Sequence, residues 1–301
     1  MREKTEIVVS PRPEIAGRIN LYKYVSVKAL EGLLRYGDFR VCYRKDSNDP
    51  QEMTPAGYLP GEESTYSTRG FVSFTAKSDC APMWGNYADK YAGACIEFQF
   101  TYFDPEHAAH ANDKERYVFM TLSKLAELGF EIKYIKAFLD ENDGMLKTSI
   151  ARQLLVKCKY QSDRKRVRFP EASRTEEEAE KKGSEYWWRI MCTKDGDWAY
   201  EEEYRLPLSS LADVSRVDYT MPPMYFTNIA TPYIKKIVLG PACPLTREDA
   251  KKMIYFSSKE REKYLIPDDV VVTKASFTRN SYALDDSGVM HPVFDGCWEN
   301  D

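Results

Sequence analysis

The stretch of the sequence best suited to chemistry is WAYEEEYRL, residues 198–206, where three consecutive glutamates lie between aromatic residues and precede an arginine. A run of like charges is usually a solvated face or a disordered tail, but its tryptophan, tyrosine and leucine neighbours predict a strand. Because side chains alternate along a strand, we expect Glu201, Glu203 and Arg205 on one face and Glu202 on the other. The first face would line a cleft, and the mainly aromatic second face would cover the core.

Two carboxylates on one face of a strand can perform two tasks in a reaction that breaks a glycosidic bond. One carboxylate stabilises the positive charge that develops on the sugar, and the other takes a proton from the acceptor. Arg205 would help to keep both carboxylates ionised. The simpler interpretation is an exposed polar strand face held by Glu–Arg pairing, and the strand alone does not decide between them.

The amino-terminal part of the chain predicts a strand, a short helix and a second strand. Residues 19–25 alternate and are rich in β-forming types. Ser26 is a suitable N-cap for a helix that carries leucines at helical spacing and stops at Gly37. Residues 39–43 read as the second strand. The segment 45–70 is turn-rich, and we expect a long surface loop there, a type of segment that often carries function.

The rest of the chain alternates strand and helix signals. We expect a mainly helical region over residues 112–157, from apolar residues repeating at three and four, and a further helix over residues 173–194. Thr246 should cap a helix near the carboxyl end. Strands are predicted at 70–76, 94–100, 154–169, 232–241 and 270–277. The expected architecture is one α+β domain over residues 1–301 with a mainly helical insertion at about 105–195.

The composition limits the classes of protein that fit. The chain has 301 residues, 43 % hydrophobic content and a net charge of −4, which is typical of a globular protein without a global attraction to nucleic acid or anionic membranes. No apolar run is long enough to span a membrane, and the first residues lack a signal-peptide core. Seven scattered cysteines predict free thiols, so we expect a cytoplasmic protein. With only three histidines, we expect no metal site.

The order of several motifs resembles a large bacterial and phage family that is known only as a domain of unknown function. The motifs are LYKY, NDP with Glu52 close behind, SFT, MWGNYADKYAGACIEF, WAYEEEYRL and IKKIVLGP. The resemblance runs from about Leu21 to Ile254, and the helical middle matches poorly. Val25 and Gln51 depart from the residues that the family often has after LYKY and NDP.

That family in turn looks like a distant relative of the ADP-ribosyltransferase fold, with its split mixed or antiparallel sheets. Such enzymes place a polar residue on a first strand, a serine or threonine on a second, and a glutamate pair of the form E-x-E on a late strand. The resemblance implies Glu203 at the ribose of NAD and Glu201 as the acid on the acceptor side, and it leaves open whether the two roles are the other way round. The implied NAD-binding residues are Tyr24, Lys23, Ser73, Thr75, Tyr87 and Arg205.

Each of these binding residues also has a simpler interpretation. Tyr24 fits a half-buried strand tyrosine, Lys23 a surface lysine, and Ser73 a buried serine bonded to the backbone. Trp84 and Tyr87 are suited to packing at the base of a cleft. The basic stretch RKRVRF, with Arg164, Arg166 and Arg168 on one strand face, would suit either a pyrophosphate or a solvated edge strand.

The resemblance implies an NAD-consuming enzyme that transfers ADP-ribose to a protein or nucleic acid, acting as a toxin, a defence effector or a counter-defence factor. One alternative is a non-catalytic module that binds a nucleotide, a nucleic acid or a protein on the same fold. Another is a metal-dependent nuclease that uses Asp49, Glu52 and the glutamate row with magnesium.

Overall fold

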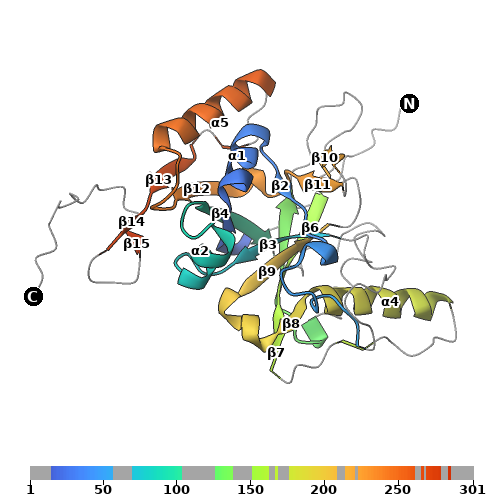
Figure 1. Cartoon of the computed structure of the whole chain (residues 1–301). Helices are drawn as coiled ribbons and strands as arrows, with labels where there is room; N and C mark the ends of the chain where they lie inside the picture. The colour runs from blue at the N-terminus through green and yellow to red at the C-terminus, as the bar shows by residue number, and fades with distance from the viewer. Residues whose placement is uncertain are drawn as a thin grey trace, which may run out of the picture. The chain divides into compact units, whose positions relative to one another are not determined.

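The computed structural model describes residues 15–56, 70–103, 126–137, 151–162, 167–168, 176–208, 214–220, 223–261, 266–267, 269–278 and 284–285. The architecture is α+β, as expected, with an eight-stranded mixed sheet in the order β1-β3-β9-β6-β5-β4-β12-β13 (Figure 1). The sheet strands are β1 (Ile15–Val25), β3 (Phe71–Thr75), β4 (Ala94–Phe103), β5 (Ile132–Ala137), β6 (Ala151–Lys157), β9 (Glu203–Pro207), β12 (Ile234–Leu239) and β13 (Val271–Lys274). Within this sheet β12 and β13 pair in parallel, whereas β3–β9, β9–β6, β6–β5, β5–β4 and β4–β12 are antiparallel.

The remaining elements are short strands and helices. The small strands are β2 (Phe39–Arg40), β7 (Lys159–Gln161), β8 (Thr193–Asp195), β10 (Arg216–Asp218), β11 (Met224–Thr227), β14 (Ser276–Phe277) and β15 (Leu284–Asp285). The helices are α1 (Val27–Tyr36), α2 (Ala81–Tyr87), α4 (Glu176–Met191) and α5 (Arg247–Arg261), with 3-10 turns η1 (Arg44–Asp46), η4 (Gly196–Glu201) and η6 (Thr231–Tyr233). None of the helices in the described ranges is both long and apolar enough to cross a membrane.

The chain, expected to be a single domain, divides into two compact units. Unit 1 comprises residues 1–20, 41–76 and 99–225, and unit 2 comprises residues 21–40, 77–98 and 226–301. The core of unit 1 joins a loop residue, strand residues and one face of α4. Its buried members are Met53, Phe71, Phe130, Leu154, Val156, Trp187, Met191 and Cys192.

Unit 2 contains the helices whose ends were predicted. Ser26 accepts a hydrogen bond from Ala29 N at 3.2 Å and so caps α1, and Gly37 ends the helix in the left-handed conformation with φ 66°. Thr246 Oγ1 likewise accepts from Asp249 N at 3.1 Å at the start of α5. In Figure 1, α1 and α5 lie side by side.

The prediction of a mainly helical region over residues 112–157 is wrong where the structure describes it. Residues 132–137 and 151–157 are the antiparallel strands β5 and β6, with Ile132 opposite Val156. Ile132 packs against the unit 1 core, and Ile135 is fully buried. Both faces of β5 therefore contact apolar side chains, and apolar residues on both faces of a strand can reproduce a helical spacing. The helix predicted at 173–194 is confirmed as α4 over Glu176–Met191, but Thr193 and Lys194 belong to β8.

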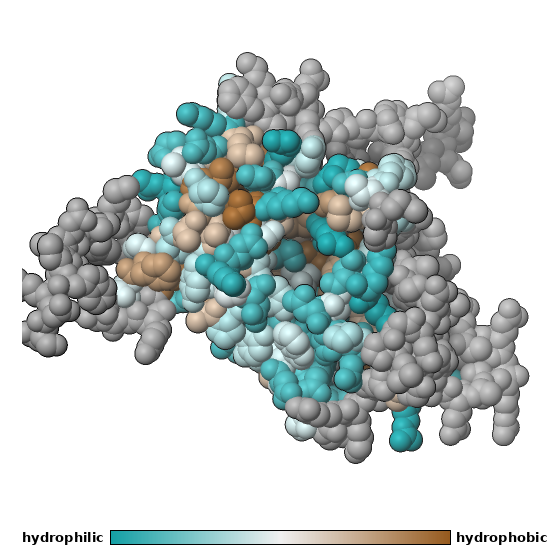
Figure 2. All heavy atoms as spheres, viewed as in Figure 1, coloured by the Kyte–Doolittle hydropathy of each residue, from teal (hydrophilic) through white to brown (hydrophobic). Residues whose placement is uncertain are grey.

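Most of the other strand predictions are confirmed, and the cysteines of the described ranges carry free thiols. Arg164 and Arg166 of the basic stretch, together with residues 57–69 of the expected loop, lie outside the described residues. The face drawn in Figure 2 is mainly hydrophilic, with small hydrophobic patches. The large apolar side chains that are most exposed are Tyr219, Tyr255, Val271 and Phe277.

The second glycine of the MWGNYADKYAG motif, Gly93, is required by a close approach of two backbone segments in unit 2. Residues Asp89, Lys90 and Tyr91 all have positive φ, so the chain reverses in a left-handed turn before it enters β4. A Cβ atom on Gly93 would lie 2.0 Å from the carbonyl oxygen of Val25. No side chain fits there unless the backbone moves.

We therefore expect Gly93→Ala to lower the free energy of unfolding by about 2–3 kcal/mol, because a buried overlap with backbone has to be relieved. Gly85→Ala is the matched control, since a Cβ atom there would meet nothing within 4 Å. This change within α2 should leave the stability unchanged or raise it by up to about 1 kcal/mol. Urea unfolding of both variants measures the difference, and equal stabilities would contradict the packing argument.

Candidate functional site: a buried ion network beside a pocket

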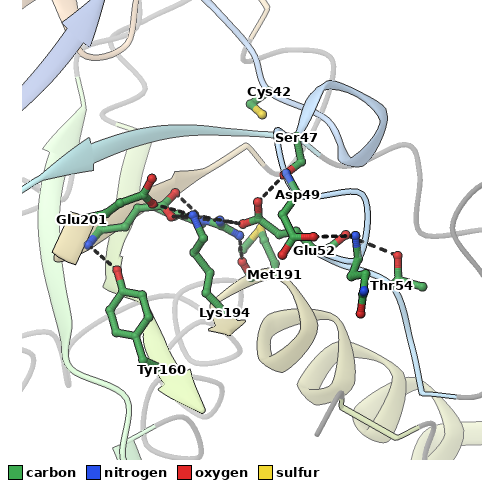
Figure 3. A network of polar contacts seen from close by, with 12 residues as sticks. Cys42, Ser47, Asp49, Glu52, Thr54, Tyr160, Met191, Lys194 and Glu201 are labelled. Carbon is green, nitrogen blue, oxygen red and sulfur yellow. Dashed lines mark hydrogen bonds and ion pairs between the residues drawn. The ribbon is translucent and has the colours of Figure 1, made fainter. Parts of the chain in front are cut away.

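Five charged side chains of unit 1 form a buried network (Figure 3). The network consists of Glu52, Lys194, Glu201, Glu203 and Arg205. Each side chain is at most 6 % exposed. Charged side chains are rarely buried without partners, because the transfer of an isolated ion from water costs several kcal/mol.

Lys194 lies among the three carboxylates. Its Nζ is 2.6 Å from Glu201 Oε2, 2.9 Å from Glu203 Oε2 and 3.8 Å from Glu52 Oε1. It also lies 5.1 Å from the centre of the Trp198 ring. Burial alone would lower the pKa of Lys194, but the attraction of Glu203 and Glu201 outweighs it and raises the pKa above that of a free lysine. Its pairing therefore stabilises the fold fully below pH 10.5, the ordinary lysine pKa, and is lost at higher pH.

Arg205 is the second cation of the network. Its Nε and Nη2 contact the two carboxylate oxygens of Glu203 at 2.8 and 3.1 Å, which is the strong bidentate arrangement. Nη2 also donates to Glu52, and Nη1 donates to the carbonyl oxygen of Met191 at the end of α4. Burial lowers the pKa of Arg205 to about 9, which still leaves the guanidinium charged at pH 7.

Short backbone elements bring these side chains together. Lys194 lies in β8, which pairs with β7 in parallel, and Glu203 and Arg205 lie in β9. The hydroxyl of Tyr160 in β7 accepts a hydrogen bond from Glu203 N at 2.8 Å. Thr75 Oγ1 in β3 donates to the carbonyl oxygen of Glu201. β7, β8, η4 and β3 thus hold the backbone on both sides of the glutamate row.

The expectation that Glu201, Glu203 and Arg205 share one strand face is wrong for Glu201. Glu201 ends the 3-10 turn η4, and Glu202 follows in the left-handed conformation with φ 43° and ψ 51°. β9 begins only at Glu203. The two carboxylates still converge, but they do so on Lys194 and not by strand alternation. The sequence pattern misses this because three glutamates between aromatic residues give no sign of a left-handed residue.

The face is also more enclosed than expected. Glu203 and Arg205 are buried, at 5 % and 1 % exposure, where an open cleft was predicted. Ser73 is opposite Arg205 in the β3–β9 register, and Thr75 is opposite Glu203. The structure therefore brings Ser73, Thr75 and the glutamate row together in unit 1.

The three other predicted NAD-binding residues belong to unit 2. Tyr24 donates to the carbonyl oxygen of Lys77 and accepts from Cys80 N, both at 3.2 Å, and its ring meets that of Trp84 edge-on at 5.2 Å. Burial raises the pKa of its hydroxyl, so it stays neutral. These contacts give Tyr24 a structural role. Lys23 and Tyr87 are half-buried.

A pocket of about 300 Å³ opens beside the network in unit 1. One wall is the loop around Glu52, and the opposite wall is β8 with the start of η4. The described residues that line it are Asn48, Asp49, Pro50, Gln51, Glu52, Met53, Thr54, Gln161, Val167, Ile190, Thr193, Lys194, Asp195, Asp197 and Trp198. Its size is at the small end of the range of about 300–1,000 Å³ for ligand pockets. The lining combines an aromatic ring with more carboxylates than cations.

Lys194 is a residue that the sequence analysis did not single out. A lysine seven positions before a glutamate has no recognisable pattern, and only the tertiary structure brings it to the carboxylates. Glu52 was considered only for a metal-dependent nuclease.

The raised pKa of Lys194 predicts low reactivity towards an acetylating reagent. At pH 8 we expect Lys194 to be acetylated at least about tenfold more slowly than the exposed Lys28 and Lys45, because little free amine is present. Peptide mass spectrometry of briefly labelled, folded protein gives the rates. Faster labelling of Lys194 than of the two controls would mean that its pKa is depressed, as in a nucleophilic lysine.

The left-handed conformation of Glu202 can be tested by substitution. Glu202→Gly should leave the free energy of unfolding unchanged or raise it by about 1 kcal/mol, because glycine adopts this conformation without strain. Glu202→Val should lower it by about 1–2 kcal/mol, because a β-branched residue is strained there. Chemical unfolding compares the two variants. A valine variant as stable as the glycine variant would rule out the left-handed turn.

The comparisons with known proteins cover only part of the chain. No curated protein matches it, and neither does any solved structure. A family model matches residues 83–206, a narrower range than the one over which the motifs suggested a resemblance. This range includes Lys194 and the glutamate row but not Glu52. The matching model is DUF2971, which is described as a protein of unknown function, so residues 83–206 are similar to that family.

Proposed function

We propose that the protein is an NAD-consuming enzyme of the ADP-ribosyltransferase type, whose reaction takes place at the pocket of unit 1. The observation that carries the proposal is the gathering of Glu52, Glu201 and Glu203 beside a pocket that can take a ligand. The proposed setting is bacterial or phage conflict, in which the enzyme acts as a toxin, a defence effector or a counter-defence factor. The acceptor would be a protein or a nucleic acid.

The chemistry requires a carboxylate next to the ribose of NAD. When the bond between the ribose carbon and the nicotinamide nitrogen breaks, nicotinamide leaves with the electron pair and the ribose becomes an oxocarbenium ion. The acceptor nucleophile then forms a bond to that carbon, and its proton passes to a carboxylate. A fixed negative charge stabilises the positive transition state, most strongly where water is excluded.

The lining of the pocket supports this substrate. The pyridinium ring of NAD carries a positive charge, and Asp49, Asp195 and Asp197 surround the pocket with negative charge. Trp198 also lines the pocket, and aromatic rings attract flat cationic groups. A pocket of about 300 Å³ would take one end of the dinucleotide, the nicotinamide and its ribose.

The arrangement favours this proposal over a metal-dependent nuclease. In a nuclease the glutamate row and Glu52 would converge on magnesium. In this structure the ammonium of Lys194 lies among the same three carboxylates, and Arg205 holds two of them. Two of the three negative charges are therefore already compensated by protein cations.

We expect the purified protein to release nicotinamide from NAD and to label a macromolecule in cell lysate. Chromatography of the products and biotinylated NAD measure the two activities. Trp198→Ala should lower kcat/KM for nicotinamide release by about tenfold, because the ring that faces the substrate is lost. Tyr219→Ala is the control, since Tyr219 is 85 % exposed and does not line the pocket.

Two outcomes would contradict the proposal. One is a wild-type protein that neither binds NAD in calorimetry nor releases nicotinamide with lysate present. The other is release that Trp198→Ala and Tyr219→Ala leave equally unchanged. Partner capture from lysate that does not depend on the glutamates would favour the non-catalytic binding module.

A further inference from the structure

We infer that Glu52 is the carboxylate that acts on the bound ligand, and that Glu201 and Glu203 hold the two cations that position it. For the identity of the ligand, this inference rests on the proposed function. The assignment of Glu52 stands on the geometry of unit 1 and differs from the roles that the E-x-E pattern implies for Glu201 and Glu203.

The first observation is the lining of the pocket. Of the three carboxylates in the network, Glu52 is the one that lines the pocket; Lys194 is the cation that does so. Glu201 and Glu203 lie behind Lys194, bound to it at 2.6 and 2.9 Å. A ligand in the pocket would therefore meet Glu52 first.

The second observation is the charge of the network. Three carboxylates and two cations leave a formal charge of −1. Glu203 takes both the bidentate contact of Arg205 and a contact of Lys194, and Glu201 takes the shortest contact of Lys194. Glu52 is farthest from Lys194, at 3.8 Å, and shares Arg205 with Glu203. The surplus negative charge of the network therefore reaches the pocket through Glu52, because Glu52 is the one of the three carboxylates that lines it.

The third observation is the rigid backbone that presents Glu52. The next residue, Met53, has φ 54°, a strained conformation for a residue other than glycine, and its side chain is buried in the core of unit 1. Asp49 Oδ1 accepts from Gln51 N at 2.8 Å, and Ser47 donates its hydroxyl to Glu52. Figure 3 shows Ser47 and Asp49 beside Glu52. The carboxylate is thus fixed before a ligand arrives, as electrostatic stabilisation of a transition state requires.

The ligand class follows from the surroundings of Glu52. Asp49, Asp195 and Asp197 line the same pocket, and Lys194 is already bound to carboxylates. The group that contacts Glu52 should therefore carry a positive charge or develop one during the reaction, as the ribose of NAD does.

The test compares conservative variants of two glutamates. Glu52→Gln keeps the shape of the side chain and lets its amide oxygen accept from Arg205. We expect it to lower kcat for nicotinamide release by about 100-fold or more with little change in KM, and to leave Tm unchanged or raised. Glu52→Asp should recover part of the loss. Glu203→Gln should instead lower Tm by about 5 °C or more, because it breaks the bidentate pair.

A full loss of activity in a Glu203→Gln variant with an unchanged Tm, together with an active Glu52→Gln variant, would overturn the inference. A Tm that falls as far in Glu52→Gln as in Glu203→Gln would also overturn it, because Glu52 would then be a structural member of the network.

A second measurement needs no NAD and so separates this inference from the proposed function. Glu52→Cys and Glu203→Cys are treated with methanethiosulfonate reagents that carry a positive or a negative charge, and the wild-type chain gives the background from the native thiols. We expect the thiol at position 52 to react in the folded protein, faster with the cationic reagent, and the thiol at 203 to react only after unfolding. Equal rates at both positions, or a preference for the anionic reagent at position 52, would contradict the inference. If the protein shows this labelling but releases no nicotinamide, the role of Glu52 stands and only NAD as the substrate is rejected.

Discussion

The ammonium of Lys194 among three carboxylates is the interaction around which unit 1 is arranged. Buried charges are tolerated only when each has partners at hydrogen-bonding distance. The backbone must therefore deliver Lys194 from β8, Glu201 from η4 and Glu203 from β9 to one point. α4 contributes as well, because its last carbonyl oxygen, that of Met191, accepts from Arg205. Together these short elements position the charge cluster, which none of them could hold alone.

Local sequence patterns predicted much of the fold. Ser26 and Gly37 mark the ends of α1 because capping is a property of a few adjacent residues. The β-branched and aromatic residues of FVSFT and IKKIVL likewise identify β3 and β12. Apolar residues on both faces of β5 led to the wrong prediction of a helix. Their spacing of three residues also fits one face of a helix. Only tertiary contacts decide such cases.

The sequence predicted only part of the site, again because the rest depends on tertiary contacts. The sequence pointed to Glu201, Glu203 and Arg205, and these side chains do converge. It could not place Lys194 among them, because that contact depends on how β8 pairs with β7 and on the left-handed residue between η4 and β9. Nor could it show that Tyr24 is held by backbone groups of its own unit. Patterns of residue type predict faces, but the partners of a buried charge depend on the assembled fold.

The contact between Arg205 and Glu52 joins residues 153 positions apart in the chain. At a synthesis rate of about 5–20 residues per second, roughly 8–30 s separate the two residues on the ribosome. During that time Glu52 cannot contact Arg205. The contact between Glu52 and Arg205 therefore cannot form until the chain has grown past Arg205. The enclosed site therefore forms only after β9 is available, however early the local helices and hairpins appear.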